Sequence, residues 1–240
     1  MRLSAPIHRL KRAARMQARD QAIPLHAALD RVAIAEGFAS WSLLASRHRR
    51  QAHDPARLHA MLLPGELVLI AARPHQGKTV LALRLALAAI AGGNSAHFFS
   101  LDYTPRDISG ALSALPADLS RYATDLNVDC SDHISADHLI QRLASAAPHT
   151  LIVVDYLQLL DQKRTHPPLQ QQVETLAAFA RQRGLIVVFI CQIDRTFDPA
   201  DAPMPGPADI RLPNPLDLGL FSRFWFLHDG HLQMAGAATA

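Results

Sequence analysis

Cysteine and long apolar runs are scarce in this sequence. Its 240 residues include two cysteines, Cys130 and Cys191, which supply no disulfide framework and fit a reducing compartment. The longest apolar candidate is interrupted by Arg84, so no run reaches the roughly 18 residues that a membrane span requires. The N-terminus is basic and polar and lacks the apolar core of a secretory signal. We therefore expect a cytoplasmic protein without a membrane segment.

Charge is modest in amount and uneven along the chain. Charged residues make up 19% and hydrophobic residues 49%, which describes a globular chain and excludes a disordered one. Residues 1–60 contain 11 Lys/Arg and 4 Asp/Glu, whereas the remainder contains 13 and 17. The basic segment, including Arg12 and Arg15, is a candidate contact for nucleic acid. A solvated basic helix face is an equally good interpretation of the same residues, and both stay open here.

Strand and helix patterns alternate from Glu66 onward. Apolar runs predict strands at 66–71, 96–101, 126–129, 150–155, 185–191 and 223–228. Helical periodicity predicts helices at 78–91, 105–113, 136–147 and 169–183. Two of the strand runs are apolar on both faces, as in a parallel sheet covered by helices. We predict an α/β fold, a mostly parallel twisted sheet flanked by helices, with its site at the C-terminal ends of the strands.

The N-terminal part predicts a small all-α segment. Residues 5–20 have a helical pattern, Pro24 opens a second helix that Gly37 ends, and Ser40 is placed to cap a third. We expect a basic helical segment at 1–50, a linker at 51–61 and the α/β domain at 62–240. The stretch 194–217 contains six prolines and predicts a mobile loop.

The stretch from Glu66 to Ala91 carries the strongest functional signal. An apolar run leads into a short polar turn, and a helical pattern follows from Gly77-Lys78-Thr79. This order is typical of a phosphate-binding loop, where Lys78 would reach the β- and γ-phosphates and the Thr79 hydroxyl would ligate Mg²⁺. The pattern G-x-x-x-x-G-K-[ST] has one departure, because Ala72 stands at its first glycine. We expect nucleotide binding by Ala72, Arg73, Pro74, His75, Gln76, Gly77, Lys78, Thr79 and Val80, with an ordinary strand–turn–helix as the alternative.

Polar residues end three of the predicted strands. Asp155 follows an apolar strand and is placed to hold Mg²⁺ as a Walker B aspartate, or else to cap a turn. Asp102 could orient or deprotonate an attacking water, or it could serve only the helix start at Thr104–Asp107. Gln192 could sense a γ-phosphate, or it could be a simple strand-end residue. The functional set is therefore Lys78, Asp102 and Gln192 for catalysis, and Thr79 with Asp155 for Mg²⁺.

A group of residues with metal-ligand side chains lies between 130 and 138. It contains Cys130, Asp132, His133, Asp137 and His138, but their spacing matches no zinc pattern. Ser131 and Ser135 with Asp137 instead predict a helix start. We expect no metal site in this group.

These segments together resemble the ATPase domain of DnaB-type replicative helicases, in the RecA-like P-loop superfamily. The segments that carry the resemblance are PGELVLIAARPHQGKT at 64–79, FFSLD at 98–102, LIVVDYLQLL at 151–160, ICQIDR at 190–195 and, more faintly, ADIRLPNPLDLGLFSRFWFLHD at 208–229. The resemblance implies a RecA-like ATPase domain at 62–240 that binds ATP and Mg²⁺. It also implies single-stranded DNA or DNA-processing proteins as partners, and a homo-oligomer.

The sequence departs from the family pattern at three places. The family has Glu where this chain has Asp102, and the shorter side chain could slow hydrolysis. The loop beyond Arg195 is acidic and proline-rich, which is poor for phosphate contact. The family's C-terminal strands, with an arginine finger, have no counterpart beyond a short GHLQM segment at 230–234. DNA contacts are expected from Arg12, Arg15, Lys163, Arg164 and Arg195.

The sequence therefore supports two functional hypotheses. The first is an ATP-hydrolysing, DnaB-helicase-like P-loop ATPase associated with DNA. The second is an ATP-dependent regulatory or interaction module without helicase activity.

Overall fold

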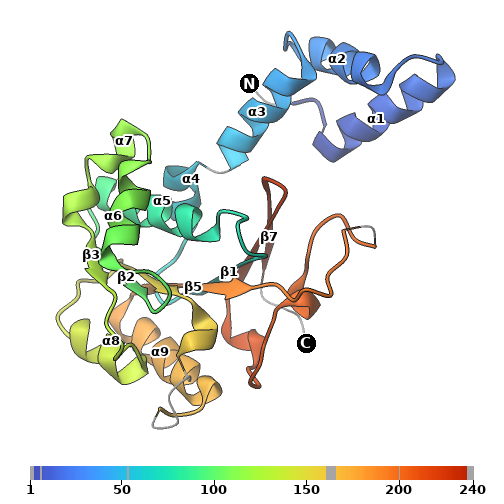
Figure 1. The fold of residues 1–240 in the computed structure, drawn as a ribbon. Coiled ribbons are helices and arrows are strands. Elements are labelled where there is room, and N and C mark those ends of the chain that lie inside the picture. Colours follow the sequence, from blue (N-terminus) through green and yellow to red (C-terminus); the bar gives the residue numbers. More distant parts are fainter. Residues whose placement is uncertain (1–2, 6, 53, 161–165, 200, 237–240) are drawn as a thin grey trace. The chain divides into compact units, whose positions relative to one another are not determined.

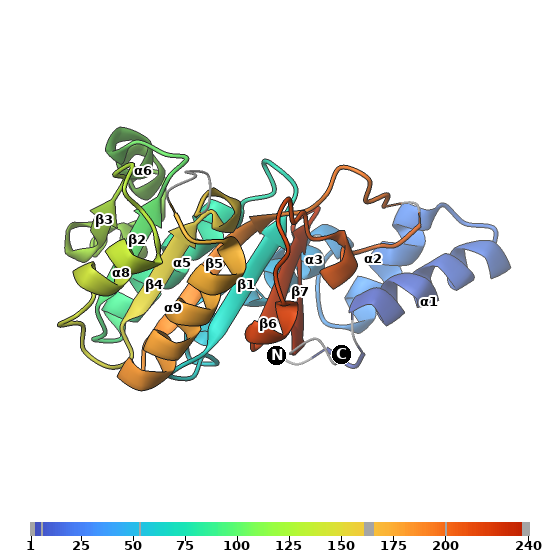
Figure 2. The same cartoon turned by 90° about the horizontal axis from the view of Figure 1, so that it is seen from below.

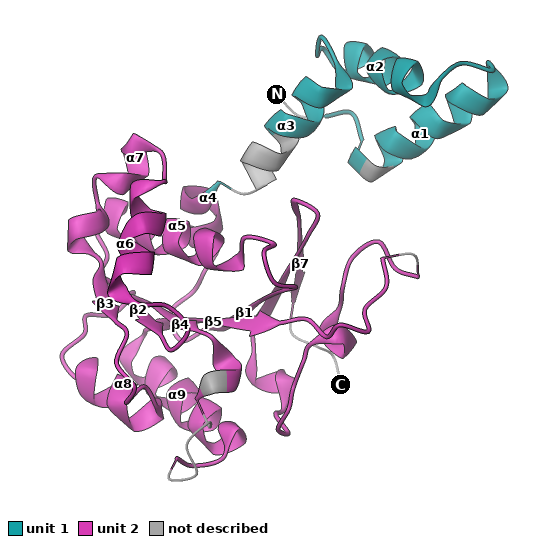
Figure 3. Ribbon diagram, viewed as in Figure 1, with its two compact units in different colours: residues 1–54 teal, residues 55–240 magenta. Residues whose placement is uncertain are grey.

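The computed structural model describes residues 3–5, 7–52, 54–160, 166–199 and 201–236. The chain divides into two compact units, residues 1–54 and residues 55–240 (Figure 3). Among the described residues, no helix has the length and apolar character needed to cross a membrane.

The first unit contains three helices, α1 Ile7–Asp20, α2 Leu25–Ala35 and α3 Trp41–Ala52. As expected, Gly37 adopts a left-handed conformation (φ 83°) after α2, and the Ser40 hydroxyl accepts a bond from Leu43 N at 3.3 Å at the start of α3. Asp30 of α2 also accepts from Trp41 N at 2.8 Å, which ties α2 to the start of α3. The buried side chains of this unit are small or aliphatic: Leu10, Ala14, Ala28, Ala33 and Leu44.

The second unit is built on a seven-stranded sheet with the order β3-β2-β4-β5-β1-β6-β7 (Figure 1). The strands are β1 Leu67–Ala72, β2 Ala96–Ser100, β3 Asn127–Asp129, β4 Leu151–Asp155, β5 Ile186–Gln192, β6 Arg223–His228 and β7 His231–Gly236. All neighbouring pairs are parallel except β6 and β7, which form an antiparallel hairpin. The six strands predicted from apolar runs are confirmed, and residues 231–234 of the GHLQM segment belong to a seventh.

Helices cover both faces of this sheet, as its apolar strands require. The larger helices are α5 Lys78–Ala91, α6 Pro105–Ser113, α8 Ala136–Arg142 and α9 Leu169–Arg183, with a short α7 at Ala117–Ser120. Alternate residues of β1 enter opposite cores. Val68 and Ile70 pack in the core that contains α5, whereas Leu67 and Leu69 pack in the core that contains α9. Figure 2 looks onto the face covered by α8 and α9.

The end of α8 differs from the sequence-based expectation. The pattern predicts a helix to residue 147, but α8 ends at Arg142. After Arg142 the chain continues in turns, in which Ala146 N donates to Leu143 O at 3.0 Å. The turn is closed by the hydroxyl of Thr150, which donates to Ala147 O at 2.6 Å.

The segment expected to be a linker, 51–61, is largely helical where it is described. Helix α3 extends to Ala52, and a further helix, α4, spans Pro55–His59. A five-residue helix is not stable alone. Leu58 is 2% exposed and packs in the α5 core, and such burial contributes about 1.5–3 kcal/mol. The second unit therefore begins at Pro55, earlier than the predicted boundary at 62.

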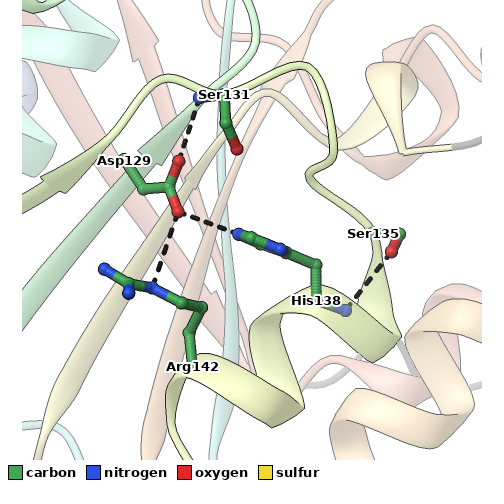
Figure 4. A network of polar contacts seen from close by, with 5 residues as sticks. All are labelled: Asp129, Ser131, Ser135, His138 and Arg142. Carbon is green, nitrogen blue, oxygen red and sulfur yellow. Dashed lines mark hydrogen bonds and ion pairs between the residues drawn. The ribbon is translucent and has the colours of Figure 1, made fainter.

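A polar network joins β3 to α8 (Figure 4). Asp129 Oδ2 lies 2.8 Å from His138 Nε2 and 3.7 Å from Arg142 Nε, and Ser131 N donates to Asp129 Oδ1 at 2.9 Å. Burial tends to raise the pKa of Asp129, but the bonds from His138 and Ser131 outweigh it and hold the pKa below its usual value. Ser135 caps α8 by accepting from His138 N at 3.3 Å, as the sequence predicts. Among the described residues, no group of His, Cys, Asp and Glu is arranged to hold a metal.

Candidate nucleotide site

Four parallel strands end at the same edge of the sheet and bring the predicted polar residues together. β1 ends at Ala72, which pairs in register with Gln192 at the end of β5. β4 ends at Asp155, which pairs with Ser100 at the end of β2. Because parallel strands point the same way, the segments after these residues all emerge at this edge. Strand order thus brings the residues predicted from separate sequence segments to one edge of the sheet.

The segment between β1 and α5 forms the turn expected of a phosphate loop. His75 and Gly77 both have left-handed backbones, with φ of 62° and 83°, and α5 begins at Lys78. No side chain caps the start of α5. Its first N–H groups are therefore available to an anion, and the helix dipole favours negative charge there.

Ala72 occupies the position of the missing first glycine. It is the last residue of β1, is fully buried, and packs in the α5 core. Its carbonyl accepts a bond from Ile193 N at 3.1 Å. A residue in an extended strand needs no left-handed conformation, so a small side chain is tolerated here. Gly77, in contrast, has the left-handed backbone that does favour glycine.

Thr79 and Asp155, the two residues predicted to hold Mg²⁺, are in direct contact. Thr79 Oγ1 donates to Asp155 Oδ2 at 2.9 Å, across 76 positions of sequence. Asp155 is 2% exposed, and burial raises its pKa from 3.8 to about 6. The bond from Thr79 and the charge of Lys78 partly oppose this rise. A hydroxyl and a carboxylate side by side, both oxygen donors, fit the ligand preference of Mg²⁺.

Asp102 lies just beyond β2 and faces the same edge. It is exposed, and its charge contributes to the raised pKa of Asp155. Two interpretations of Asp102 were open: it could act in catalysis, or it could stabilise only the start of α6. The capping box of α6 is made by Thr104 and Asp107, with Thr104 N donating to Asp107 Oδ2 at 2.9 Å and Asp107 N to Thr104 Oγ1 at 3.3 Å. Asp102 is therefore not needed for that helix start.

The phosphate loop is tied to two distant segments. The Arg73 guanidinium donates through Nη2 to the carbonyl of Arg195 at 2.9 Å and also to the carbonyl of Phe197. Gln76 Oε1 accepts from Asp229 N at 2.8 Å, at the turn between β6 and β7. Neither link was expected from the sequence, which assigned Arg73 and Gln76 to nucleotide binding. The side chain of Arg73 is directed to the loop after β5.

The segment after Gln192, expected to be a mobile loop, is anchored at both of its ends. Ile193 forms a β-bridge with Ile210, and Arg211 N donates to Gln192 O at 2.8 Å. Phe197 is 5% exposed and its ring packs edge-on against His228, with 5.4 Å between ring centroids. Phe197 and Ile210 are apolar residues in a proline-rich stretch, and from them this anchoring could have been predicted. Gln192 itself is half-buried.

Comparison with known proteins agrees with this arrangement. No protein-family model matches the chain. The replicative DNA helicase DnaB of Helicobacter pylori (strain ATCC 700392 / 26695) is 26% identical over 172 residues, covering 59% of this chain and 35% of that protein. The chain thus matches about a third of the length of this curated relative.

Two solved structures share the fold at 20% sequence identity. One is a DnaB-like replicative helicase, studied with its interactions with primase, which matches with a TM-score of 0.57 over 70% of this chain and 48% of that chain. The other is the ATPase domain of another protein, with a TM-score of 0.53 over 68% of this chain and 69% of that chain. The second unit has the RecA-like fold of DnaB-type helicases.

The residues predicted to contact DNA lie on separate segments of the chain. Arg195 is exposed in the segment after β5, where its carbonyl accepts from Arg73. Arg12 and Arg15 lie on α1 of the first unit and are exposed. Lys163 and Arg164 lie outside the described residues. The residues predicted to bind nucleotide lie in one stretch from the end of β1 to the start of α5, whereas the predicted DNA contacts come from several stretches.

Proposed function

We propose that the DnaB-type domain binds ATP with Mg²⁺ and hydrolyses it slowly. The observation that carries this proposal is the 2.9 Å contact between Thr79 and Asp155 directly beside an uncapped helix start. In a strand–turn–helix that binds no ligand, a buried carboxylate whose ionisation is disfavoured would not stabilise the fold. Nucleotide with its cation supplies the positive charge that an ionised Asp155 requires.

Each residue has a role that follows from its place. The N–H groups at the start of α5 and the Lys78 ammonium would bind the phosphates, while Thr79 and Asp155 would hold Mg²⁺. Bound Mg²⁺ offsets negative charge that develops on the phosphate oxygens. Asp102, exposed at the same edge, would orient the attacking water and accept its proton. Gln192 would respond to the γ-phosphate and pass its presence to the segment that begins at Ile193.

A lysine substitution tests this proposal. Lys78→Ala should abolish both ATP binding and turnover, because the ammonium that neutralises the phosphates is lost. Lys11→Ala, an exposed lysine on α1, is the matched control and should bind ATP like the parent chain. Binding is measured by calorimetry with ATP and Mg²⁺, and circular dichroism verifies that both variants are folded. Unchanged ATP affinity in Lys78→Ala would refute the site.

A second candidate function is an ATP-dependent interaction module without unwinding activity. It is favoured by the segment after Arg195, where Asp198 and Asp201 introduce negative charge and prolines are frequent. Such a segment is a poor contact for DNA phosphates but is suitable for a protein partner. In this case ATP would alter the segment through Arg73 and Gln192, and a partner would respond.

One assay separates the two candidates. ATP hydrolysis is measured with and without single-stranded DNA on the full chain. Stimulation by DNA supports a helicase-related ATPase, whereas negligible turnover that DNA does not change supports the interaction module. Mass in solution with and without ATP tests the proposed homo-oligomer, which DnaB-type similarity motivates. A DNA-processing partner such as primase, with which the similar helicase structure interacts, belongs to the first candidate only.

A further inference from the structure

Helix α1 of the first unit has one buried face and one basic face. Leu10 and Ala14 are 7% and 0% exposed, and α1 packs along α2. At about 100° per residue, five exposed basic residues lie within an arc of roughly 160° on the opposite side. We call this set the α1 basic face; it consists of Arg9, Lys11, Arg12, Arg15 and Arg19.

The α1 basic face is not what helix stability alone would favour. Neighbours at three or four positions, such as Arg12 with Arg15 and Arg15 with Arg19, repel one another. No acidic residue precedes Asp20 in the helix, and none is present in its first turn, where the helix dipole disfavours positive charge. Among the described residues, none of the five forms an ion pair. An anionic partner would relieve this repulsion.

The unit that contains this face is basic as a whole. Residues 1–54 include 10 Lys/Arg and 4 Asp/Glu, so attraction of an anion extends beyond α1. Four of the five residues in the face are arginines, whose planar guanidinium groups match phosphate in a bidentate manner. From Arg9 to Arg19 the helix rises about 15 Å, over which one strand of a duplex carries about four phosphates.

We propose that the α1 basic face binds the phosphate backbone of nucleic acid without reading its sequence. An anionic membrane fits less well, because the apolar side of α1 is already buried within the first unit and cannot insert into a bilayer. An acidic protein fits less well too, since interfaces rely on large apolar or aromatic anchors. Among the α1 side chains that the structure describes, Met16, 58% exposed, is the one large apolar residue on the surface.

The proposal does not depend on the ATP site, so it is tested without nucleotide. The full chain is titrated into a fluorescent oligothymidylate and, separately, a duplex of mixed sequence, at several salt concentrations. Each phosphate contact contributes about 0.7 to the salt slope for single strands. The double variant Arg12→Gln with Arg15→Gln should therefore reduce the slope by about 1.4 and weaken binding about 25-fold near 0.1 M salt.

A matched variant controls for net charge. Arg57→Gln with Arg181→Gln removes the same charge from exposed positions of the second unit, and it should leave binding nearly unchanged. Thermal unfolding should show the α1 variant to be at least as stable as the parent, because repulsion along the helix is relieved. Equal losses in both variants, or no binding to either nucleic acid, would overturn the proposal. Binding to phosphatidylserine vesicles in place of nucleic acid would overturn it as well.

Discussion

Arg73 lies with its guanidinium carbon 5.5 Å from the centroid of the Phe197 ring, so the phosphate loop is in contact with the segment after β5. The same side chain donates to the carbonyls of Arg195 and Phe197. Its Nε is buried and has no partner. Because Phe197 also packs on His228, the phosphate loop, the 193–211 segment and the end of β6 form one continuous set of contacts. A ligand that moves the loop would therefore act on both neighbouring segments.

Arg73→Ala should loosen the 193–211 segment. Charge-assisted hydrogen bonds and a cation–π contact are together worth about 2–4 kcal/mol, so local opening should become easier by tenfold or more. Hydrogen exchange of amides 193–199 and 201–211 measures this directly. Arg106→Ala, an exposed arginine of α6, is the control and should leave that exchange unchanged. Unaltered exchange in Arg73→Ala would show that the contact does not hold the segment.

Asp155→Asn should stabilise the chain in the absence of nucleotide. The pKa of Asp155 is raised to about 6 in the folded state, above its ordinary 3.8, so ionisation opposes folding. Stability is then lost as the pH rises from about 4 to 6, and the loss persists above pH 6. The difference corresponds to roughly 3 kcal/mol, which the uncharged amide would largely recover at pH 7.

Urea unfolding at pH 7 and below pH 4 measures this effect. The gain in Asp155→Asn should be present at pH 7 and small at the lower pH, and binding of ATP with Mg²⁺ should be lost. Asp118→Asn on α7, an exposed carboxylate, is the control and should change stability little at either pH. A variant that is less stable than the parent at pH 7 contradicts the burial argument.

Asp102 offers a test of the proposed proton acceptor. Asp102→Asn should lower turnover by about 100-fold or more, because a general base contributes at least that factor. Asp102→Glu lengthens the side chain toward the residue found in DnaB-type helicases and should raise turnover above that of the parent. Both are measured as kcat at saturating ATP, with ATP affinity expected to change little. Equal turnover in the parent and Asp102→Asn would show that Asp102 is not the proton acceptor.

Gly77 and Gly110 both have room for a Cβ but differ in backbone conformation, so alanine at each position tests the effect of conformation alone. A Cβ at Gly77 would meet nothing within 4 Å, but its φ of 83° makes alanine strained by about 1–2 kcal/mol. Gly77→Ala should therefore lower stability and weaken ATP binding through a shifted loop. Gly110→Ala lies inside α6, also with open space, and should raise stability by about 0.5–1 kcal/mol. If Gly77→Ala is as stable as the parent or more stable in urea unfolding, the conformational argument for Gly77 is wrong.

The order of strands and helices was predictable from the sequence by itself. Runs of four to seven residues predicted the six strands from β1 to β6 to within a residue or so, and helical periodicity predicted α5, α6 and α9. The turn that contains Gly77 and the start of α5 at Lys78 were predictable because their signal lies within a few consecutive residues. Patterns of this kind are local, since they reflect side-chain periodicity and backbone preference. The end of α8 was mispredicted, and the linker expected at 51–61 contains helix α4, whose Leu58 is buried in the α5 core.

The tertiary structure alone decided which of these residues meet. Thr79 and Asp155 are 76 positions apart, and only the placement of β4 beyond β5 in the sheet brings them to 2.9 Å. That Ala72 is the last residue of β1, one residue beyond the predicted strand, was seen only in the structure. The contacts of Arg73 and Gln76 depend on the course of two later segments. The motifs predicted that Thr79 and Asp155 act on the same Mg²⁺, but the contact itself depends on strand order and register, which are set by packing of the whole chain.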